Sequence, residues 1–172
     1  MKKLIYVLCV VAILVSCQQS QKIAYIDNGK VINEYQEKID IEEKFKIKDE
    51  AFKKRTDSIG KAFQLEAQDF QLKSKKMSQK NAQEKYQELG QKQQLLQQQI
   101  QFEQQQLTSA FQEELDSVIV GVKKFVHNYG KDNGYTFILG TSDGAASVLY
   151  GKDENNISQT IIDALNSAYK KD

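Results

Sequence analysis

The feature that most constrains this chain is a stretch of about a hundred residues, Gln36 to Gly134, that contains no proline. Lys, Glu, Gln, Asp, Ala and Leu dominate it, with widely spaced Phe, Ile and Val. Good helix formers without a breaker predict long helix. Short segments of β type, Lys22–Asp27 and Tyr135–Leu139, flank the stretch on both sides. The sequence therefore predicts a long helical excursion that grows out of a small mixed α/β base.

Apolar residues recur at seven-residue intervals along this stretch, joined by steps of three and four, which is the pattern of a coiled coil with one narrow buried stripe. The step of four from Ile59 to Phe63 is interpreted as one shift in phase. The stripe is expected at Phe45, Phe52, Ile59, Phe63, Phe70 and Met77, and then at Leu89, Leu96, Ile100, Leu107, Phe111, Leu115, Val118, Val122, Phe125 and Tyr129.

A single helix of this length would extend for about 150 Å. Two antiparallel arms of roughly 65–75 Å are favoured, because both flanking segments belong to one base. The turn between them is expected within Ser74–Asn81, near residue 82, and Gly90 is the competing position. The predicted fold class is α+β and predominantly helical, with a long antiparallel helical-hairpin arm on a β-rich base.

The base is predicted from short segments at both ends of the arm. The strand Lys22–Asp27 is expected to be covered on both faces, and Asp27 or Asn28 to cap a short helix after it. Gly134 is expected to end the second arm in the left-handed conformation. The segments Tyr135–Leu139 and Ala146–Tyr150 are expected to pair as a hairpin.

Ser158 is predicted to cap a final helix, whose buried face would carry Ile161, Ile162, Leu165 and Ala168. A sheet of three short strands with one or two helices is too small to be stable alone, so other copies of the chain are expected to pair with it. The expected oligomerisation residues are Ile23, Tyr25, Ile26, Tyr135, Phe137, Leu139, Val148 and Tyr150.

The N-terminus has the order of a bacterial lipoprotein signal. Two lysines precede an apolar run of about a dozen residues, which ends in Leu14-Val15-Ser16-Cys17 and resembles a lipobox. Cys17 would be lipidated and would tether the mature chain to a membrane through residues 17–21. The alternative is an ordinary secretory signal peptide with an incidental cysteine. Removal of residues 1–16 would leave 22 basic against 23 acidic residues, a balance that does not support binding to nucleic acid.

Two polar features of the arm have both a functional and a solvated interpretation. Lys73, Lys75, Lys76, Lys80 and Lys85 make the expected tip basic, either as a solvated end or as a rim that attracts acidic chains or anionic lipid. Gln makes up 10 of the 16 residues from position 91 to 106. This run is interpreted as a solvated helix face, because apolar residues interrupt it at helical spacing.

The sequence contains no pattern that indicates catalysis or a cofactor. The chain has one histidine, His127, and no glycine-rich phosphate loop, Cys/His metal spacing or nucleophile elbow. The predictions therefore include no catalytic, cofactor-binding or metal-binding residue.

The chain resembles the Skp (also called OmpH) family of periplasmic chaperones over essentially its whole mature length. The residues that carry the resemblance are Lys22–Asp27, Val31–Tyr35, Val122–Leu139 and Val148–Leu165. The resemblance implies a homotrimer with a β-rich base (22–35 and 134–172) and helical arms (36–133). These arms would enclose unfolded outer-membrane proteins in the periplasm of a Gram-negative-type envelope, without ATP or another cofactor.

Three departures from the family pattern are visible. Well-known members are strongly basic and soluble, whereas this chain is near neutral and carries the lipobox at Cys17. Members often have proline where this chain has Gln36, which predicts a continuous helix into the first arm. The leading hypothesis is a membrane-tethered holdase whose contacts include Lys73, Lys75, Lys76, Lys80 and Phe102, with Ile47, Leu65 and Leu72 as further apolar candidates. The alternatives are a coiled-coil lipoprotein that acts as a spacer or scaffold for a folded partner, and an enzyme subunit.

Overall fold

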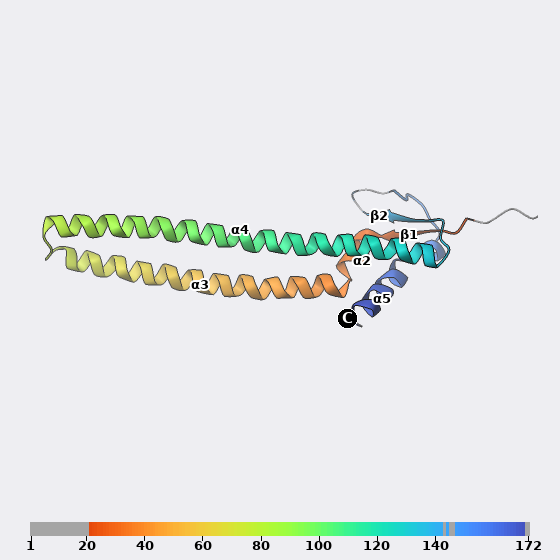
Figure 1. Ribbon diagram of the computed structural model, residues 1–172, viewed down its shortest axis with the longest axis horizontal. Helices are drawn as coiled ribbons and strands as arrows, with labels where there is room; N and C mark the ends of the chain where they lie inside the picture. The colour runs from red at the N-terminus through yellow and green to blue at the C-terminus, as the bar shows by residue number, and fades with distance from the viewer. Residues whose placement is uncertain (1–20, 143, 145–146, 171–172) are drawn as a thin grey trace, which may run out of the picture. The chain divides into compact units, whose positions relative to one another are not determined.

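A computed structural model of the chain describes residues 21–142, 144 and 147–170, which fall into two compact units. Unit 1 contains the described residues up to Val31 together with Lys123–Leu165, and unit 2 contains Ile32–Val122 together with the chain from Asn166. The predicted signal peptide and Cys17 lie outside the described residues. The elements in chain order are β1 (Ile23–Asp27), α2 (Asn28–Asn33), α3 (Gln36–Ser74), α4 (Gln79–Asp132), β2 (Phe137–Thr141), a 3-10 turn η1 (Asp153–Asn155) and α5 (Ser158–Tyr169) (Figure 1).

The sheet of unit 1 joins the two segments that flank the helical excursion. Strands β1 and β2 are parallel, with Ile23 opposite Phe137 and Asp27 opposite Thr141. Parallel strands need a long crossover connection, and here the helices between β1 and β2 supply it. The other edge of β1 is also occupied, since the backbone N–H of Ile157 donates to the carbonyl of Tyr25 at 3.0 Å.

The predicted hairpin between Tyr135–Leu139 and Ala146–Tyr150 is wrong in the described part of the chain. Residues 147–150 form no strand, and Leu149 and Tyr150 are almost fully exposed. The segment has the composition of a strand, but β2 pairs instead with β1, which lies more than a hundred residues earlier. Composition indicates β propensity and cannot identify the partner, because strand pairing depends on tertiary context.

Two predicted helix ends are confirmed. Asp27 caps α2, since its Oδ1 accepts the backbone N–H of Lys30 at 3.0 Å. Gly134 ends α4 with a φ of 70°. The N–H of Tyr135 donates to the carbonyl of Gly130 at 2.9 Å, and that of Gly134 to Lys131 at 3.3 Å. These two bonds form a Schellman motif, which requires the left-handed residue.

The cap of α5 differs from the prediction. Asn156 Oδ1 accepts the backbone N–H of Ser158 at 3.0 Å and its hydroxyl at 2.6 Å. The Ser158 hydroxyl oxygen in turn accepts the N–H of Asp27 at 2.8 Å, so this side chain links α5 to β1 instead of capping its own helix. Ile161, Ile162 and Leu165 are buried as predicted, whereas Ala168 is exposed.

Helices α3 and α4 form the predicted antiparallel hairpin in unit 2 (Figure 1). Residues 75–78 connect them, within the expected Ser74–Asn81 segment, and the Ser78 hydroxyl oxygen accepts the N–H of Asn81 at 3.3 Å. Gly90 lies inside α4, so the competing position of the turn is wrong.

The buried stripe of α3 is continuous, and the phase shift predicted at Ile59 is wrong. Asp49, Thr56 and Glu66 are half-buried and occupy the positions of the stripe at which the sequence has no apolar residue. With them, the buried or half-buried positions advance by alternating steps of four and three through residues 45, 49, 52, 56, 59, 63, 66 and 70. The irregular part lies in α4, where Leu107, Phe111 and Leu115 are four residues apart, and insertions of four locally unwind a coiled coil.

The entry into α3 is a break in the helix and not the predicted continuous helix. Tyr35 is extended, with φ −75° and ψ 123°, and it provides no side-chain cap. Asn166 of α5 provides one instead, because its Oδ1 accepts the N–H of Gln36 at 2.8 Å. Its amide nitrogen donates to the carbonyl of Glu34 at 3.2 Å. One side chain from the C-terminal helix thus holds both sides of the break.

The aromatic rings of Tyr35 and Tyr169 meet edge to face beside this cap, with centroids 5.9 Å apart. A hydrogen bond to Asp40 raises the pKa of the Tyr169 hydroxyl, and partial desolvation acts in the same direction. The end of α5 is therefore attached to the start of α3 by a backbone cap, a ring contact and a hydroxyl–carboxylate bond.

Replacing the capping side chain tests this attachment. We expect Asn166→Ala to lower the free energy of unfolding by about 1 kcal/mol, the usual cost of losing a helix cap. Urea unfolding followed by circular dichroism measures the change. Ser167→Ala is the matched control, because Ser167 is the exposed neighbour on the same helix. Equal unfolding midpoints for both variants would contradict the role of Asn166.

Candidate functional site

The arm exposes large apolar side chains on both of its helices. Each helix of the hairpin buries one stripe, and the apolar residues outside that stripe have no partner helix in the described chain. Proteins that expose extended apolar surface commonly use it for binding. The exposed residues of unit 2 are Ile39, Ile47, Leu65, Leu72, Met77, Tyr86, Leu95, Phe102 and Val120.

Four of these residues share one side of the hairpin, which we name the Phe102 face: Leu65, Leu72, Leu95 and Phe102. Each is between 60% and 75% exposed. Leu65 and Leu72 are seven residues apart on α3, and Leu95 and Phe102 are seven apart on α4, so each pair lies on one side of its helix.

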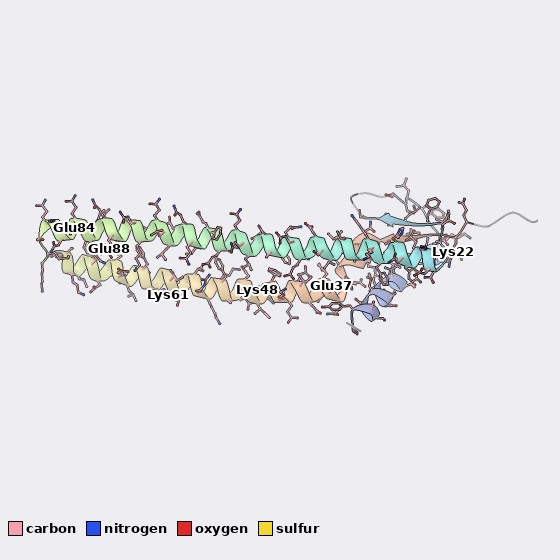
Figure 2. The ribbon with its side chains drawn as sticks, in the orientation of Figure 1. Lys22, Glu37, Lys48, Lys61, Glu84 and Glu88 are labelled. Atoms are coloured by element: carbon pink, nitrogen blue, oxygen red, sulfur yellow. The ribbon has the colours of Figure 1, made fainter. Side chains whose placement is uncertain are left out.

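The position of Lys48 shows that the pair on α3 and the pair on α4 lie on the same side of the hairpin. It lines an open groove of about 760 Å³ together with Phe52 and Phe102, which places Lys48 and Phe102 on the same side of the hairpin. Leu65 and Leu72 lie 17 and 24 residues after Lys48 in the sequence. In a coiled-coil helix with 3.5 residues per turn, this spacing places both side chains about 50° from Lys48 around the helix axis. Figure 2 labels Lys48 on α3. The Phe102 face therefore combines apolar side chains from both helices.

Glutamine side chains surround the apolar residues of this face. Gln99 and Gln106 line the groove beside Phe102, and all ten glutamines between positions 91 and 106 are exposed. The apolar residues Leu96 and Ile100 of the same run are half-buried in the seam. The interpretation of this run as a solvated helix face agrees with these positions. Glutamine can donate and accept hydrogen bonds, so this surface suits extended backbone as well as side chains.

The tip is less basic than its lysines predict. Lys73 is paired with Asp69 at 2.8 Å, and Lys80 lies 3.9 Å from Glu84. Lys85 is 2.7 Å from Glu88 and 3.5 Å from Glu66. Figure 2 labels Glu84 and Glu88 at this end of α4. Lys75 and Lys76, in the turn, make no ion pair with a described residue.

Ion pairs connect the two helices across the seam, and sequence reasoning missed them. Lys44 bonds Glu114 at 2.7 Å, and Arg55 is paired with Glu103. Glu66 accepts a hydrogen bond from Lys92, which lowers the pKa of its carboxyl, although partial desolvation acts against this shift. These charges were visible in the sequence, but the register that brings them together was not.

The apolar rings in the seam are consistent with this register. The rings of Phe45 and Phe111 are in contact, with centroids 5.1 Å apart and planes tilted by 51°. Phe45 and Leu89 are buried, whereas most other seam residues are half-buried. A two-helix seam covers only one side of each helix, so partial burial is the expected result.

The predicted oligomerisation residues do not all lie on one face of the sheet. Ile23 pairs with Phe137 and Tyr25 with Leu139, and these four side chains form a largely open apolar face. Ala24 and Ile26 are buried on the opposite face, so the expectation that β1 is covered on both sides is wrong within one chain. Tyr135 and Val148 are half-buried and Tyr150 is exposed.

The described residues provide little for catalysis or metal binding. No group of three or more His, Cys, Asp and Glu side chains among them could hold a metal ion. His127 is exposed on α4. Within the part of the chain that the structure describes, no helix has the length and apolar composition needed to cross a bilayer.

Two long antiparallel helices and a small parallel sheet define a class of helical-hairpin proteins, and comparison with known proteins identifies the family. Residues 22–165 match the family described as outer membrane protein (OmpH-like). The chain belongs to this family, as its resemblance to Skp (OmpH) predicted. No curated protein sequence matches the chain.

A solved structure has the same fold. It is a crystal structure of an OmpH-like protein from Caulobacter crescentus CB15, described as a candidate outer membrane chaperone. The two structures align with a TM-score of 0.76 and 13% sequence identity over 88% of each chain. At this identity the likeness establishes the fold, and the predicted α+β, predominantly helical architecture with a long arm is confirmed.

The bond between Lys92 and Glu66 generates a prediction about acid stability. A carboxyl whose pKa is lowered in the folded state stabilises the arm at pH values above its ordinary pKa of about 4.5. This stabilisation is lost as the pH falls through the lower pKa of the folded state. We expect Glu66→Gln to lower the melting temperature at pH 7 and to reduce the difference between pH 7 and pH 3. Thermal unfolding followed by circular dichroism measures both quantities.

Glu43→Gln is the control for the same loss of charge, because Glu43 is exposed and makes no ion pair with a described residue. The same pH dependence in both variants would show that Glu66 contributes only through net charge.

Proposed function

We propose that the protein is an ATP-independent holdase chaperone of the periplasm that encloses unfolded outer-membrane proteins between its helical arms. The single observation that carries this proposal is the Phe102 face, a partly apolar surface on both helices of the arm. Membership of the OmpH-like family and the description of the Caulobacter crescentus structure support a chaperone-type role.

The chemistry of the Phe102 face suits reversible binding of many different chains. Full burial of a Leu or Phe side chain contributes roughly 1.5–3 kcal/mol, and partial burial contributes less. A few such contacts hold an unfolded segment without committing it to one conformation. Because Leu65, Leu72, Leu95 and Phe102 lie on rigid helices, the surface remains available while the client changes shape.

Enclosure of a client requires several arms, and the open face of the sheet supplies a surface for assembly. Ile23, Tyr25, Phe137 and Leu139 would be covered by other copies of the chain, in a homotrimer as in the family resemblance. A small base whose sheet is covered on one face buries the apolar side chains of the other face when the copies assemble. The base would comprise residues 22–35 and 134–172, and the arm residues 36–133.

The chain would be held at a membrane of a Gram-negative-type envelope by lipidation of Cys17. Two or more acyl chains anchor a protein stably, where a single chain does not. The polar residues 17–21 would then be a short tether between the bilayer and the base, which keeps the chaperone where its clients cross the envelope.

An aggregation assay tests the holdase function and the role of the Phe102 face together. An unfolded outer-membrane barrel is diluted from urea, and its light scattering is followed with and without the protein. We expect suppression of aggregation at roughly one trimer per client. The quadruple variant with Leu65, Leu72, Leu95 and Phe102 changed to Gln should weaken client binding by on the order of tenfold, since it removes the apolar contacts.

Ile39→Gln/Val120→Gln is the matched control, because it removes exposed apolar residues of the same arm outside the Phe102 face. Absence of suppression by an intact trimer would exclude the holdase function and favour a coiled-coil spacer or scaffold. Equal client affinity for the quadruple variant and the control would exclude the Phe102 face as the client-binding surface.

The lipid anchor is tested by Cys17→Ser. We expect this variant to move from the membrane fraction to the aqueous periplasmic fraction, because the thiol that would carry the acyl chains is absent. Mass spectrometry of the N-terminal peptide should show diacylglycerol on Cys17 in the unchanged protein. Cys9→Ser, in the apolar run of the signal sequence, is the control and should remain membrane-bound. An unmodified Cys17 would support the ordinary secretory signal.

A further inference from the structure

Unit 1 contains a cleft of about 520 Å³ between the C-terminal end of α4 and the start of β2. Helix α4 contributes a row of basic side chains, Lys123, His127 and Lys131. These residues are four apart, so they lie along one side of the helix. Apolar side chains, among them Val126, Phe137 and Ile138, form much of the remaining wall.

The charges of the cleft are uncompensated within the described residues. All three basic side chains are exposed, and neither lysine makes an ion pair there. No acidic side chain belongs to the described lining of the cleft. Phe137 is 54% exposed at its mouth. Cationic groups beside an apolar wall are complementary to an anionic group that carries apolar chains.

The cleft is attached to the segment that would carry the lipid. The backbone N–H of Thr136, in the cleft wall, donates to the carbonyl of Lys22 at 2.8 Å. The Lys22 ammonium donates to the carbonyl of Asn133 at 3.0 Å and lies 4.0 Å from the centre of the Tyr135 ring. Figure 2 labels Lys22 in this region. Residue 22 is therefore fixed beside the cleft by three interactions.

The tether to Cys17 is short. Four residues separate Cys17 from Lys22, and the five Cα–Cα steps between them span at most about 18 Å in a fully extended chain. If Cys17 is lipidated, as in the proposed function on which this step rests, Lys22 lies within that distance of the bilayer. The tether then keeps the cleft near a surface rich in phosphate groups, at high local concentration.

We propose that the cleft binds the headgroup of an anionic phospholipid from the membrane that anchors Cys17. Lys123 and Lys131 contact the phosphate, and the apolar wall at Val126 and Ile138 covers the first part of an acyl chain. The acyl anchor and this electrostatic contact act together, since juxtamembrane lysines and lipid chains reinforce each other in membrane binding. The contact orients unit 1 on the bilayer, which a flexible tether alone does not.

Vesicle flotation tests the proposal without the lipid anchor. The protein is the complete mature chain with Cys17→Ser, and the vesicles contain phosphatidylcholine alone or with phosphatidylglycerol. We expect binding only to the anionic vesicles. Lys123→Gln/Lys131→Gln should weaken it by on the order of tenfold. Added inorganic phosphate at constant ionic strength should not compete, which distinguishes a lipid headgroup from free phosphate.

Lys54→Gln/Lys61→Gln is the matched control, because it removes the same charge from exposed positions in unit 2. An equal loss of vesicle binding in both double variants would overturn the assignment of the cleft as a lipid site, since general electrostatic attraction would then explain the binding. Failure of the folded, unchanged protein to bind anionic vesicles would also overturn it. So would a change of oligomeric mass in Lys123→Gln/Lys131→Gln, because the cleft would then be an interface between copies.

The aggregation assay without vesicles separates this proposal from the holdase function. Lys123→Gln/Lys131→Gln should suppress client aggregation as well as the unchanged protein does. A variant that has lost vesicle binding but retains suppression supports the cleft as a lipid site. Loss of suppression together with vesicle binding would overturn the assignment of these lysines to lipid.

Discussion

The parallel pairing of β1 with β2 is the constraint on which the rest of the structure depends. It joins segments more than a hundred residues apart, so the helices between them must leave the sheet and return. An antiparallel hairpin of two long helices achieves this with one short turn. Closing so long a loop costs conformational entropy. The pairing is accordingly supported at several points, including the bonds from Ile157 to Tyr25 and from Asp27 to Ser158.

A narrow apolar seam and the ion pairs across it hold the hairpin together. Because the seam is narrow, several apolar side chains of the arm remain exposed. Phe45 and Phe111 contact each other in the seam, while Phe102, a few residues away on α4, is exposed. An arm built to maximise its own stability would place such residues inside. Their exposure is a feature that a binding surface needs and a compact globule avoids.

The two units present different chemistry. Unit 2 exposes apolar side chains among glutamines, with most tip lysines neutralised by nearby acids. Unit 1 has an open sheet face and a cleft beside it, with Phe137 at the border of both, and the two lysines of the cleft make no ion pair with a described residue. The proposed client-binding surface and the proposed lipid site therefore lie in different units. Substitutions can accordingly test each of these two proposals without changing the residues of the other.

By itself, the sequence determined the long helices, the Gly134 helix end and the family resemblance, because these depend on local propensity, capping and spacing. It placed the turn within residues 74–81 but left Gly90 as a competing position. Tertiary structure alone decided which strand pairs with β1, that Asn166 caps a helix far from it in sequence, and that Ser158 bonds β1. It also decided that Glu66 meets Lys92, and that Lys123 and Lys131 share a cleft with Phe137. Each of these depends on a partner distant in the chain. Local sequence indicates that a group needs a partner, and only the folded chain brings one within bonding distance.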